Sequence, residues 1–188
     1  MPRTLLTLVL LTALLLAACG NDRTPVPDVT TPAAPRGERA VELAQAGVSF
    51  TAPANWSAIE PSDPLAGGIE SRHASLAVWR YPRTEPLPAR AAELRRVEDL
   101  LVERVRTRDA SFELERSRTT RVAGAPAIEL TGTETIAGRR LQVRSSHVFF
   151  ATAEIVLDAF APPEDFARVD RTVFAPVLDS LALAVPGG

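Results

Sequence analysis

The chain has 188 residues, a formal net charge of −2 and a single cysteine. That length suits one domain with its own hydrophobic core, and the near-neutral charge excludes a protein that binds nucleic acid through a basic surface. All 21 basic residues are arginine, whose guanidinium group binds carboxylates and phosphates in a bidentate way.

Residues 1–18 form an apolar run with one charge, Arg3, and they end in small residues before Cys19. This pattern is typical of a secretory signal peptide, and the run is shorter than the roughly 20 residues of a transmembrane helix. Leu16, Ala17, Ala18 and Cys19 resemble the lipobox of bacterial lipoproteins, whose cysteine is diacylated through sulfur and becomes the new N-terminus after cleavage. The resemblance implies lipid attachment at Cys19 and a position on the extracytoplasmic face of the cell membrane. An ordinary secreted protein with a chance cysteine is the alternative.

Residues 19–40 contain four prolines among polar and small residues and show no apolar periodicity. We interpret them as a lipidated N-terminus followed by a proline-rich linker. An extended chain of this kind reaches at most roughly 60 Å from the bilayer, at about 3.1 Å per residue. The folded domain is expected to span residues 41–185. Acylation of Cys19 would consume the only thiol, so this domain would contain neither a disulfide nor a cysteine-bound metal.

The first half of the domain predicts short strands. Apolar and polar residues alternate in 41–43 and 48–50, which flank a turn, and again in 69–71 and 75–81. Prolines and glycines in 60–68 predict a long, mobile loop.

A helix is predicted over residues 89–106, after Pro88, which suits a first helical turn. Apolar residues recur there at spacings of three, four and four, as on one face of a helix. These residues are Leu94, Val97, Leu101 and Val105.

An antiparallel β-meander is predicted from residue 112 to residue 161. Its expected strands are 112–116, 119–122, 127–135, 140–151 and 154–161. Apolar residues occupy both faces of the last two strands, as Phe149 and Val148 illustrate, so the sheet is expected to be covered on both faces. The second cover is a helical segment after Pro163, with a kink or split at Pro176. The fold class is therefore α/β of the α+β type, a single domain with an antiparallel sheet covered by helices on both faces.

The order of these elements resembles the PsbP-like fold, which includes DcrB-like bacterial lipoproteins. The resemblance rests on residues 47–56, the central helix, residues 122–130, the long hairpin and the closing segment from Phe174 to Leu181. It implies an accessory or binding domain without enzymatic activity, and it transfers no functional residue.

The residues themselves also fail to indicate an enzyme. The chain has two histidines, His73 and His147, and it lacks a Gly-x-Ser-x-Gly motif. The run Ser145, Ser146 and His147, with Asp158 on the next strand, contains the residue types of a catalytic triad. Adjacent strand residues such as Ser146 and His147, however, point to opposite faces. We therefore interpret His147 as a hydrogen-bonded, partly buried histidine. No spacing indicates a metal or a phosphate-binding loop, so no catalytic residue, metal or cofactor is expected.

Arginines gather on the meander and form the tentative binding surface. Strand alternation places Arg140 and Arg144 on one face, beside Arg139, with Arg116 and Arg118 alongside if the register permits. Grouped guanidinium groups suit an anionic glycan, a lipid headgroup or an acidic partner. A solvated sheet margin is the alternative.

Three functions follow in order of preference. The first is a membrane-anchored, non-catalytic accessory domain that assists an envelope protein complex. The second is a carrier of a small amphiphilic or anionic ligand, and the third is a hydrolase. A continuous cavity between the meander and the central helix would favour the ligand, whereas a filled core with an exposed apolar or arginine-rich patch would favour a protein partner.

Overall fold

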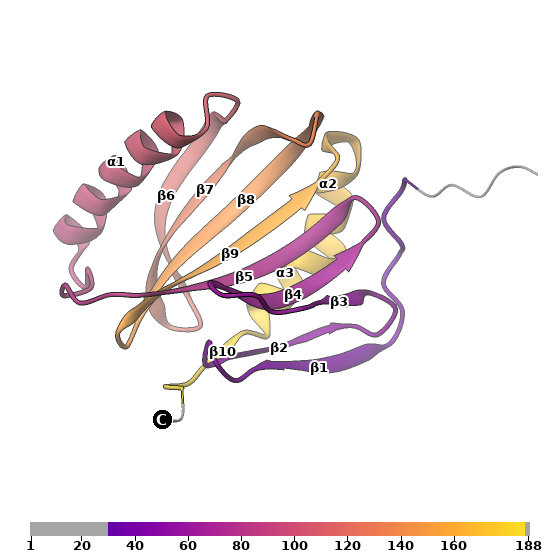
Figure 1. Ribbon diagram of the computed structural model, residues 1–188, viewed down its shortest axis with the longest axis horizontal. Coiled ribbons are helices and arrows are strands. Elements are labelled where there is room, and N and C mark those ends of the chain that lie inside the picture. Colours follow the sequence, from indigo (N-terminus) through magenta and orange to yellow (C-terminus); the bar gives the residue numbers. More distant parts are fainter. Residues whose placement is uncertain (1–29, 187–188) are drawn as a thin grey trace, which may run out of the picture.

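The computed structural model describes residues 30–186 (Figure 1). The predicted signal peptide and Cys19 lie outside these residues. A seven-stranded antiparallel sheet dominates the fold, with strand order β3-β4-β5-β9-β8-β7-β6. Its strands are β3 (Ser57–Ile59), β4 (Leu65–Ser71), β5 (Ala74–Pro82), β6 (Glu113–Val122), β7 (Ala125–Ile136), β8 (Arg139–Phe150) and β9 (Ala153–Ala161).

A small second sheet stands beside the first. It contains β1 (Glu38–Leu43), β2 (Val48–Pro53) and β10 (Ala182–Leu183), with β2 in the middle. The predicted turn between the first two strands is confirmed, since they pair as an antiparallel hairpin.

Helix α1 (Ala91–Arg108) follows Pro88 as its apolar stripe predicts. Leu94 and Val105 are buried, and Val97 and Leu101 are partly buried against the same cluster. That cluster joins the helix to Ile128 and other residues of the sheet, so α1 packs against the sheet through this stripe.

The C-terminal segment is helical and changes its hydrogen bonding at one point. It contains α2 (Pro163–Val169), a π-helical turn η1 (Asp170–Phe174) and α3 (Ala175–Asp179). The N–H of Ala175 donates to the carbonyl of Asp170, one residue farther back than in an α-helix. Pro176 follows at once and has no N–H to donate. The predicted break at this proline therefore takes the form of a π-turn.

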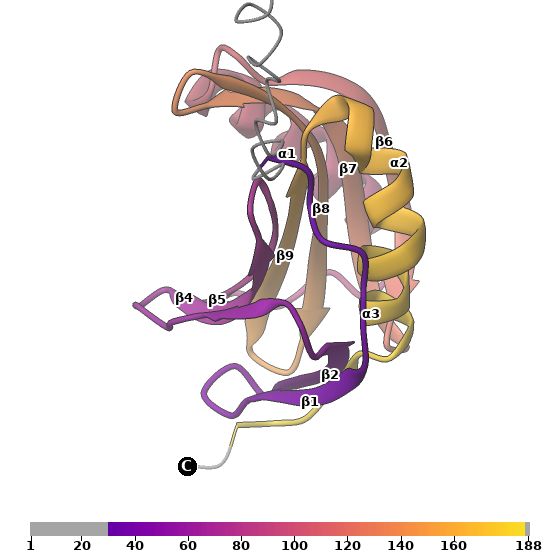
Figure 2. The same ribbon diagram turned by 90° about the vertical axis from the view of Figure 1, so that its right-hand side faces the viewer.

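The two faces of the sheet carry separate apolar clusters. Phe174, Val169 and Val177 of the C-terminal segment pack with Val148, Leu157 and other residues of one face. The α1 cluster includes Val143 and Phe149, which alternate with Val148 along β8. Figure 2 shows α2 and α3 as one helical column along one side of the large sheet. The α+β fold class is confirmed.

Two segments differ from the sequence-based expectation. Leu65 to Gly68 were predicted as part of a long mobile loop, but they form the first half of β4 and pair with β5. Residues 38–40 were predicted as linker, but they belong to β1.

Residues 30–37, also predicted as linker, lie along the domain and are hydrogen-bonded to it. Trp56 Nε1 donates to the Ala33 carbonyl at 3.2 Å, and the Ala33 N–H donates to Ser71 Oγ at 3.1 Å. The N–H of Arg36 donates to Asn55 Oδ1 at 2.8 Å. The ordered domain therefore begins well before residue 41.

Candidate functional site

A cavity of about 700 Å³ lies between the second half of α1 and the sheet. Its volume falls within the range of roughly 300–1,000 Å³ found for small-molecule sites. Its apolar wall includes Leu101, Val105, Phe112, Leu130, Val143 and Phe160.

The position of α1 explains why the cavity is there. The helix packs mainly on β6 and β7, at one end of the sheet (Figure 1). On the same face, the neighbouring strands β8, β9 and β5 carry polar side chains where a closely packed core would have apolar ones. These are Tyr81 on β5, Ser145 and His147 on β8, and Glu154 and Asp158 on β9.

These polar side chains form one continuous chain of contacts. Arg83 forms an ion pair with Glu154, and Glu154 Oε1 lies 2.7 Å from His147 Nδ1. On the other side of the imidazole ring, Nε2 lies 3.2 Å from Ser145 Oγ. Ser145 Oγ in turn lies 2.5 Å from Asp158 Oδ1. The chain runs along the floor of the cavity from Arg83, at its exposed end, to Asp158.

Ser145 joins the two ends of this chain. Its hydroxyl donates to Asp158 Oδ1, and its oxygen lies within hydrogen-bond distance of His147 Nε2.

The two carboxyl groups of this chain respond to burial in opposite ways. Burial alone would raise the pKa of Glu154, but hydrogen bonds with His147 and Arg83 outweigh it and lower the pKa to about 2. Burial raises the pKa of Asp158, and the hydrogen bond from Ser145 only partly opposes that shift. Glu154 is consequently a stable anion with two partners, whereas ionised Asp158 is poorly compensated.

A third carboxyl group, that of Glu134, also lines the cavity. Its pKa is raised by burial and by the negative charges of Asp109 and Asp158. Tyr81 also lines the cavity, and burial, followed by the negative charge of Asp158, raises the pKa of its phenol. The sheet side of the cavity is therefore acidic.

The order Ser145, His147, Glu154 matches that of a serine hydrolase triad, but the surroundings of Ser145 do not suit catalysis. Ser145 lies in the middle of β8, opposite Leu130 on one side and Asp158 on the other. Backbone N–H groups there belong to the sheet ladders, whereas acyl transfer needs free N–H donors for the oxyanion. The arrangement suits ligand recognition better than nucleophilic attack.

Ser146 is buried on the opposite face from His147, as strand alternation predicted. His147 was predicted to be hydrogen-bonded and partly buried; it is hydrogen-bonded to Glu154, and it is more fully buried, at 9% exposed. The sequence missed the pairing of His147 with Ser145 and Glu154. The signal was present in part, because residues two apart on a strand share a face. Glu154 required the register of β8 against β9.

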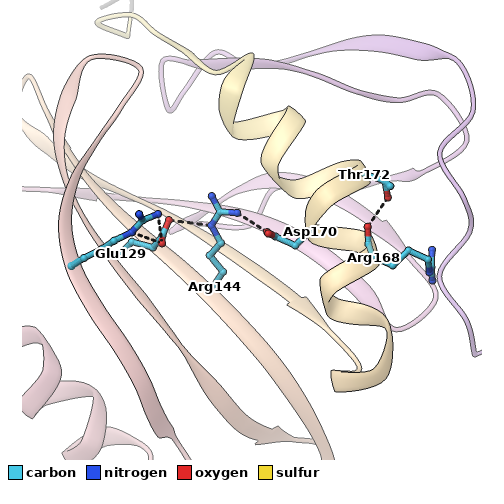
Figure 3. A network of polar contacts seen from close by, with 6 residues as sticks. Glu129, Arg144, Arg168, Asp170 and Thr172 are labelled. Carbon is cyan, nitrogen blue, oxygen red and sulfur yellow. Dashed lines mark hydrogen bonds and ion pairs between the residues drawn. The ribbon is translucent and has the colours of Figure 1, made fainter.

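The four predicted surface arginines share one face of the sheet, as the strand register shows. Three of them form ion pairs within the protein. Arg140 pairs with Glu113 at 2.7 Å, and Arg118 pairs with Glu129 at 2.7 Å. Arg144 lies 3.1 Å from Glu129 and 2.5 Å from Asp170 of η1, which joins the sheet to the C-terminal segment (Figure 3).

Arg116 has no ion pair among residues 30–186 and is the most available of the four. A binding role for this surface stays a prediction. Within the same residues, no group of three or more potential metal ligands is found. None of the helices in the described part of the chain combines the length and hydropathy that a membrane span requires.

Comparison with solved structures identifies the fold. The solution structure of cyanobacterial PsbP (CyanoP) from Synechocystis sp. PCC 6803 matches with a TM-score of 0.59 and 14% sequence identity, covering 78% of this chain and 92% of that chain. LpqN of Mycobacterium tuberculosis, described as involved in cell envelope biogenesis, matches with a TM-score of 0.55 and 14% identity, covering 79% and 91%. The chain has a PsbP-like fold. No family model and no curated protein matches the sequence.

Proposed function

We propose that this protein is a lipid-anchored, extracytoplasmic binding domain that holds a small amphiphilic molecule between α1 and the sheet. The observation that carries the proposal is the cavity of about 700 Å³, which combines an apolar wall with converging polar side chains. Such a combination is typical of a ligand site.

The cavity favours a ligand over a protein partner as the main function. Among residues 30–186, the exposed large apolar side chains are Leu100, Ile136 and Val185, which lie on separate elements. Single exposed apolar residues are ordinary on soluble surfaces. The surface arginines, moreover, are mostly neutralised by neighbouring carboxylates. We therefore place ligand binding ahead of the accessory role that the sequence favoured.

A cavity-filling substitution tests this function. Leu101 lines the cavity from α1 and is only partly buried, so Leu101→Trp should place a larger side chain in the cavity without disturbing the sheet. The chain from residue 20 onward contains every described element and avoids an acyl group. We expect it to bind the neutral dye Nile red with saturable fluorescence, and we expect Leu101→Trp to weaken binding at least about tenfold, or roughly 1.4 kcal/mol.

Asp99→Trp is the matched control, because Asp99 is exposed on the same helix and does not line the cavity. It should leave the dye affinity unchanged. Absence of saturable dye binding, or equal affinities of Leu101→Trp and the parent chain, would contradict the proposed ligand site.

The anchor is a separate part of the proposal and rests on Leu16, Ala17, Ala18 and Cys19. In a bacterial host, the full chain should incorporate labelled palmitate and fractionate with membranes, since two or more acyl chains anchor a protein stably. Cys19→Ser should abolish incorporation. Mass spectrometry of the mature N-terminus checks the result, and an unmodified cysteine in the parent chain would contradict the anchor.

The anchor also limits the reach of the domain. Because residues 30–37 lie along the domain, only the ten residues between Cys19 and Thr30 can act as a tether. They span at most about 40 Å. The anchor would therefore hold Thr30, where the described part of the domain begins, within about 40 Å of the membrane.

A further inference from the structure

We propose that the cavity selects an organic cation: a protonated amine on an apolar alkyl or aryl body, with its ammonium group held by Asp158. This inference rests on the proposed binding function and specifies its ligand class. It follows from the placement of charges around the cavity.

The sheet side of the cavity carries more negative than positive charge. Glu134, Glu154 and Asp158 all line it, and only Glu154 forms an ion pair, with Arg83. Among residues 30–186, neither Asp158 nor Glu134 has an ion-pair partner. His147 is the remaining basic group on this side, and it already contacts Glu154 and Ser145.

The basic side chains of α1 lie at the mouth of the cavity. Arg104 and Arg108 are exposed residues that line its helical side. The charge of Arg108 lowers the pKa of Asp158 and that of Glu134, yet burial keeps both values above their ordinary range. Arg108 is therefore near these carboxyl groups without compensating them.

Asp158 is accessible to a ligand inside the cavity. It lies deep between β8, β5 and α1, but its side chain is not closed off, because it lines the cavity and keeps partial exposure. One of its oxygens accepts from Ser145. Carboxylates can accept several hydrogen bonds, and an ammonium group offers three donors. A bound ammonium group would supply the positive charge that ionised Asp158 lacks.

An anionic ligand fits this floor poorly. Its headgroup would lie beside Asp158 and Glu134 and would add a like charge to a partly desolvated site. The apolar wall, which includes Leu130, Val143 and Phe160, suits the body of either kind of amphiphile. The cavity thus discriminates between amphiphiles by the charge of the headgroup and not by the length of the chain.

A displacement series tests the selection. Nile red bound to the chain from residue 20 onward is displaced at pH 7 by decylamine, decanol or decanoate. The two ionic competitors are kept below their micellar concentrations, and decanol is kept below its solubility limit. We expect decylamine to displace the dye at a concentration at least about tenfold lower than decanoate, with decanol between them. Asp158→Asn should lose most of this preference, with each displacement normalised to the dye affinity of the same variant. Glu113→Gln, an exposed carboxylate on the other face, is the matched control and should keep it.

The outcomes separate the two proposals. Failure of Nile red to bind overturns the binding function itself. Dye binding with decanoate equal to or better than decylamine overturns only the cation selection, as does an unchanged amine preference in Asp158→Asn. If Asp158→Asn does not fold by circular dichroism, Glu134→Gln takes its place and should weaken the preference. Added salt should also weaken it, because ionic attraction at a partly open site is screened.

Discussion

Replacing Arg144 with methionine is expected to lower the free energy of unfolding by about 3 kcal/mol at neutral pH. The Arg144 side chain is 17% exposed and bridges Glu129, which is 9% exposed, and Asp170, which is 29% exposed. Removing the cation takes away the ion pair of Asp170 and leaves Glu129 with Arg118, whose side chain is 44% exposed. Breaking a buried ion pair costs roughly 3–5 kcal/mol, and the partial exposure of Asp170 places this case at the lower end.

Arg140→Met is the matched control on the same strand and face. Arg140 also pairs with a carboxylate, Glu113, but the two side chains are 57% and 65% exposed. An exposed pair contributes up to about 1 kcal/mol, so this substitution should have a small effect. Urea denaturation of both variants measures the difference. Similar losses for Arg140→Met and Arg144→Met would show that burial does not govern these pairs.

The sheet face that carries Arg116, Arg118, Arg140 and Arg144 shows what could be predicted from the sequence and what could not. Alternation along a strand was enough to place Arg140 and Arg144 on one face. Their partners were not predictable, because Glu113, Glu129 and Asp170 come from other elements. Pairing Glu129 with Arg118 also depends on the β6–β7 register, which shifts at a bulge between Leu114 and Arg116.

Secondary structure was predictable where periodicity was strong. The stripe of α1 and the alternation along β8 and β9 both correspond to buried residues. The prediction failed at Gly67 and Gly68, where glycines indicated a loop. A Cβ atom on Gly68 would lie 2.1 Å from the Leu76 carbonyl oxygen, so glycine there permits the close approach of β4 to β5.

The packing of residues 30–37 along the domain could not be predicted from the sequence, for a different reason. It has no apolar periodicity, because its contacts are hydrogen bonds that involve its own backbone. Backbone groups are present in every sequence and leave no pattern to detect.

The cavity could not be predicted from the sequence either. An apolar helical stripe indicates that α1 packs on something, but it does not fix which strands lie beneath it. The displacement of α1 toward β6 and β7 is a tertiary feature. It leaves Ser145, His147 and Asp158 facing an open volume rather than a helix.

Glu154→Gln is expected to destabilise the protein by about 2–3 kcal/mol at pH 7. The ordinary pKa of this carboxyl group is 4.5, and the folded state lowers it to about 2. A lowered folded-state pKa means that the ionised group stabilises the fold. That contribution is complete above about pH 4.5 and is lost as the pH falls toward 2. The variant and the parent chain should therefore converge in stability over this acid range.

Asp158→Asn is the matched comparison, four residues along the same face of β9. The folded state raises the pKa of Asp158, so it holds the proton more tightly than the unfolded chain does. The stability that this carboxyl group contributes is complete below its ordinary pKa and falls as the pH rises above it. Asparagine keeps an oxygen that can accept from Ser145 but carries no charge. The variant should therefore be more stable than the parent chain at pH 7 and similar to it in acid.

Urea denaturation from pH 2 to pH 8 measures both effects. The groups that face the two carboxyls are Arg83, His147 and Ser145 on the floor, with Tyr81, Glu134 and Arg108 around Asp158. Loss of stability in both variants at pH 7 would contradict the opposite pKa shifts.

Opposite effects of Glu154→Gln and Asp158→Asn on stability would also distinguish a structural carboxylate from a ligand-binding one within the same hydrogen-bonded chain. A carboxylate that stabilises the fold, such as Glu154, needs no ligand to explain it. A carboxylate that destabilises the fold at neutral pH persists where a binding function requires it, because stability and function often compete at such sites. Asp158 would then be the group in this cavity that binds the cation.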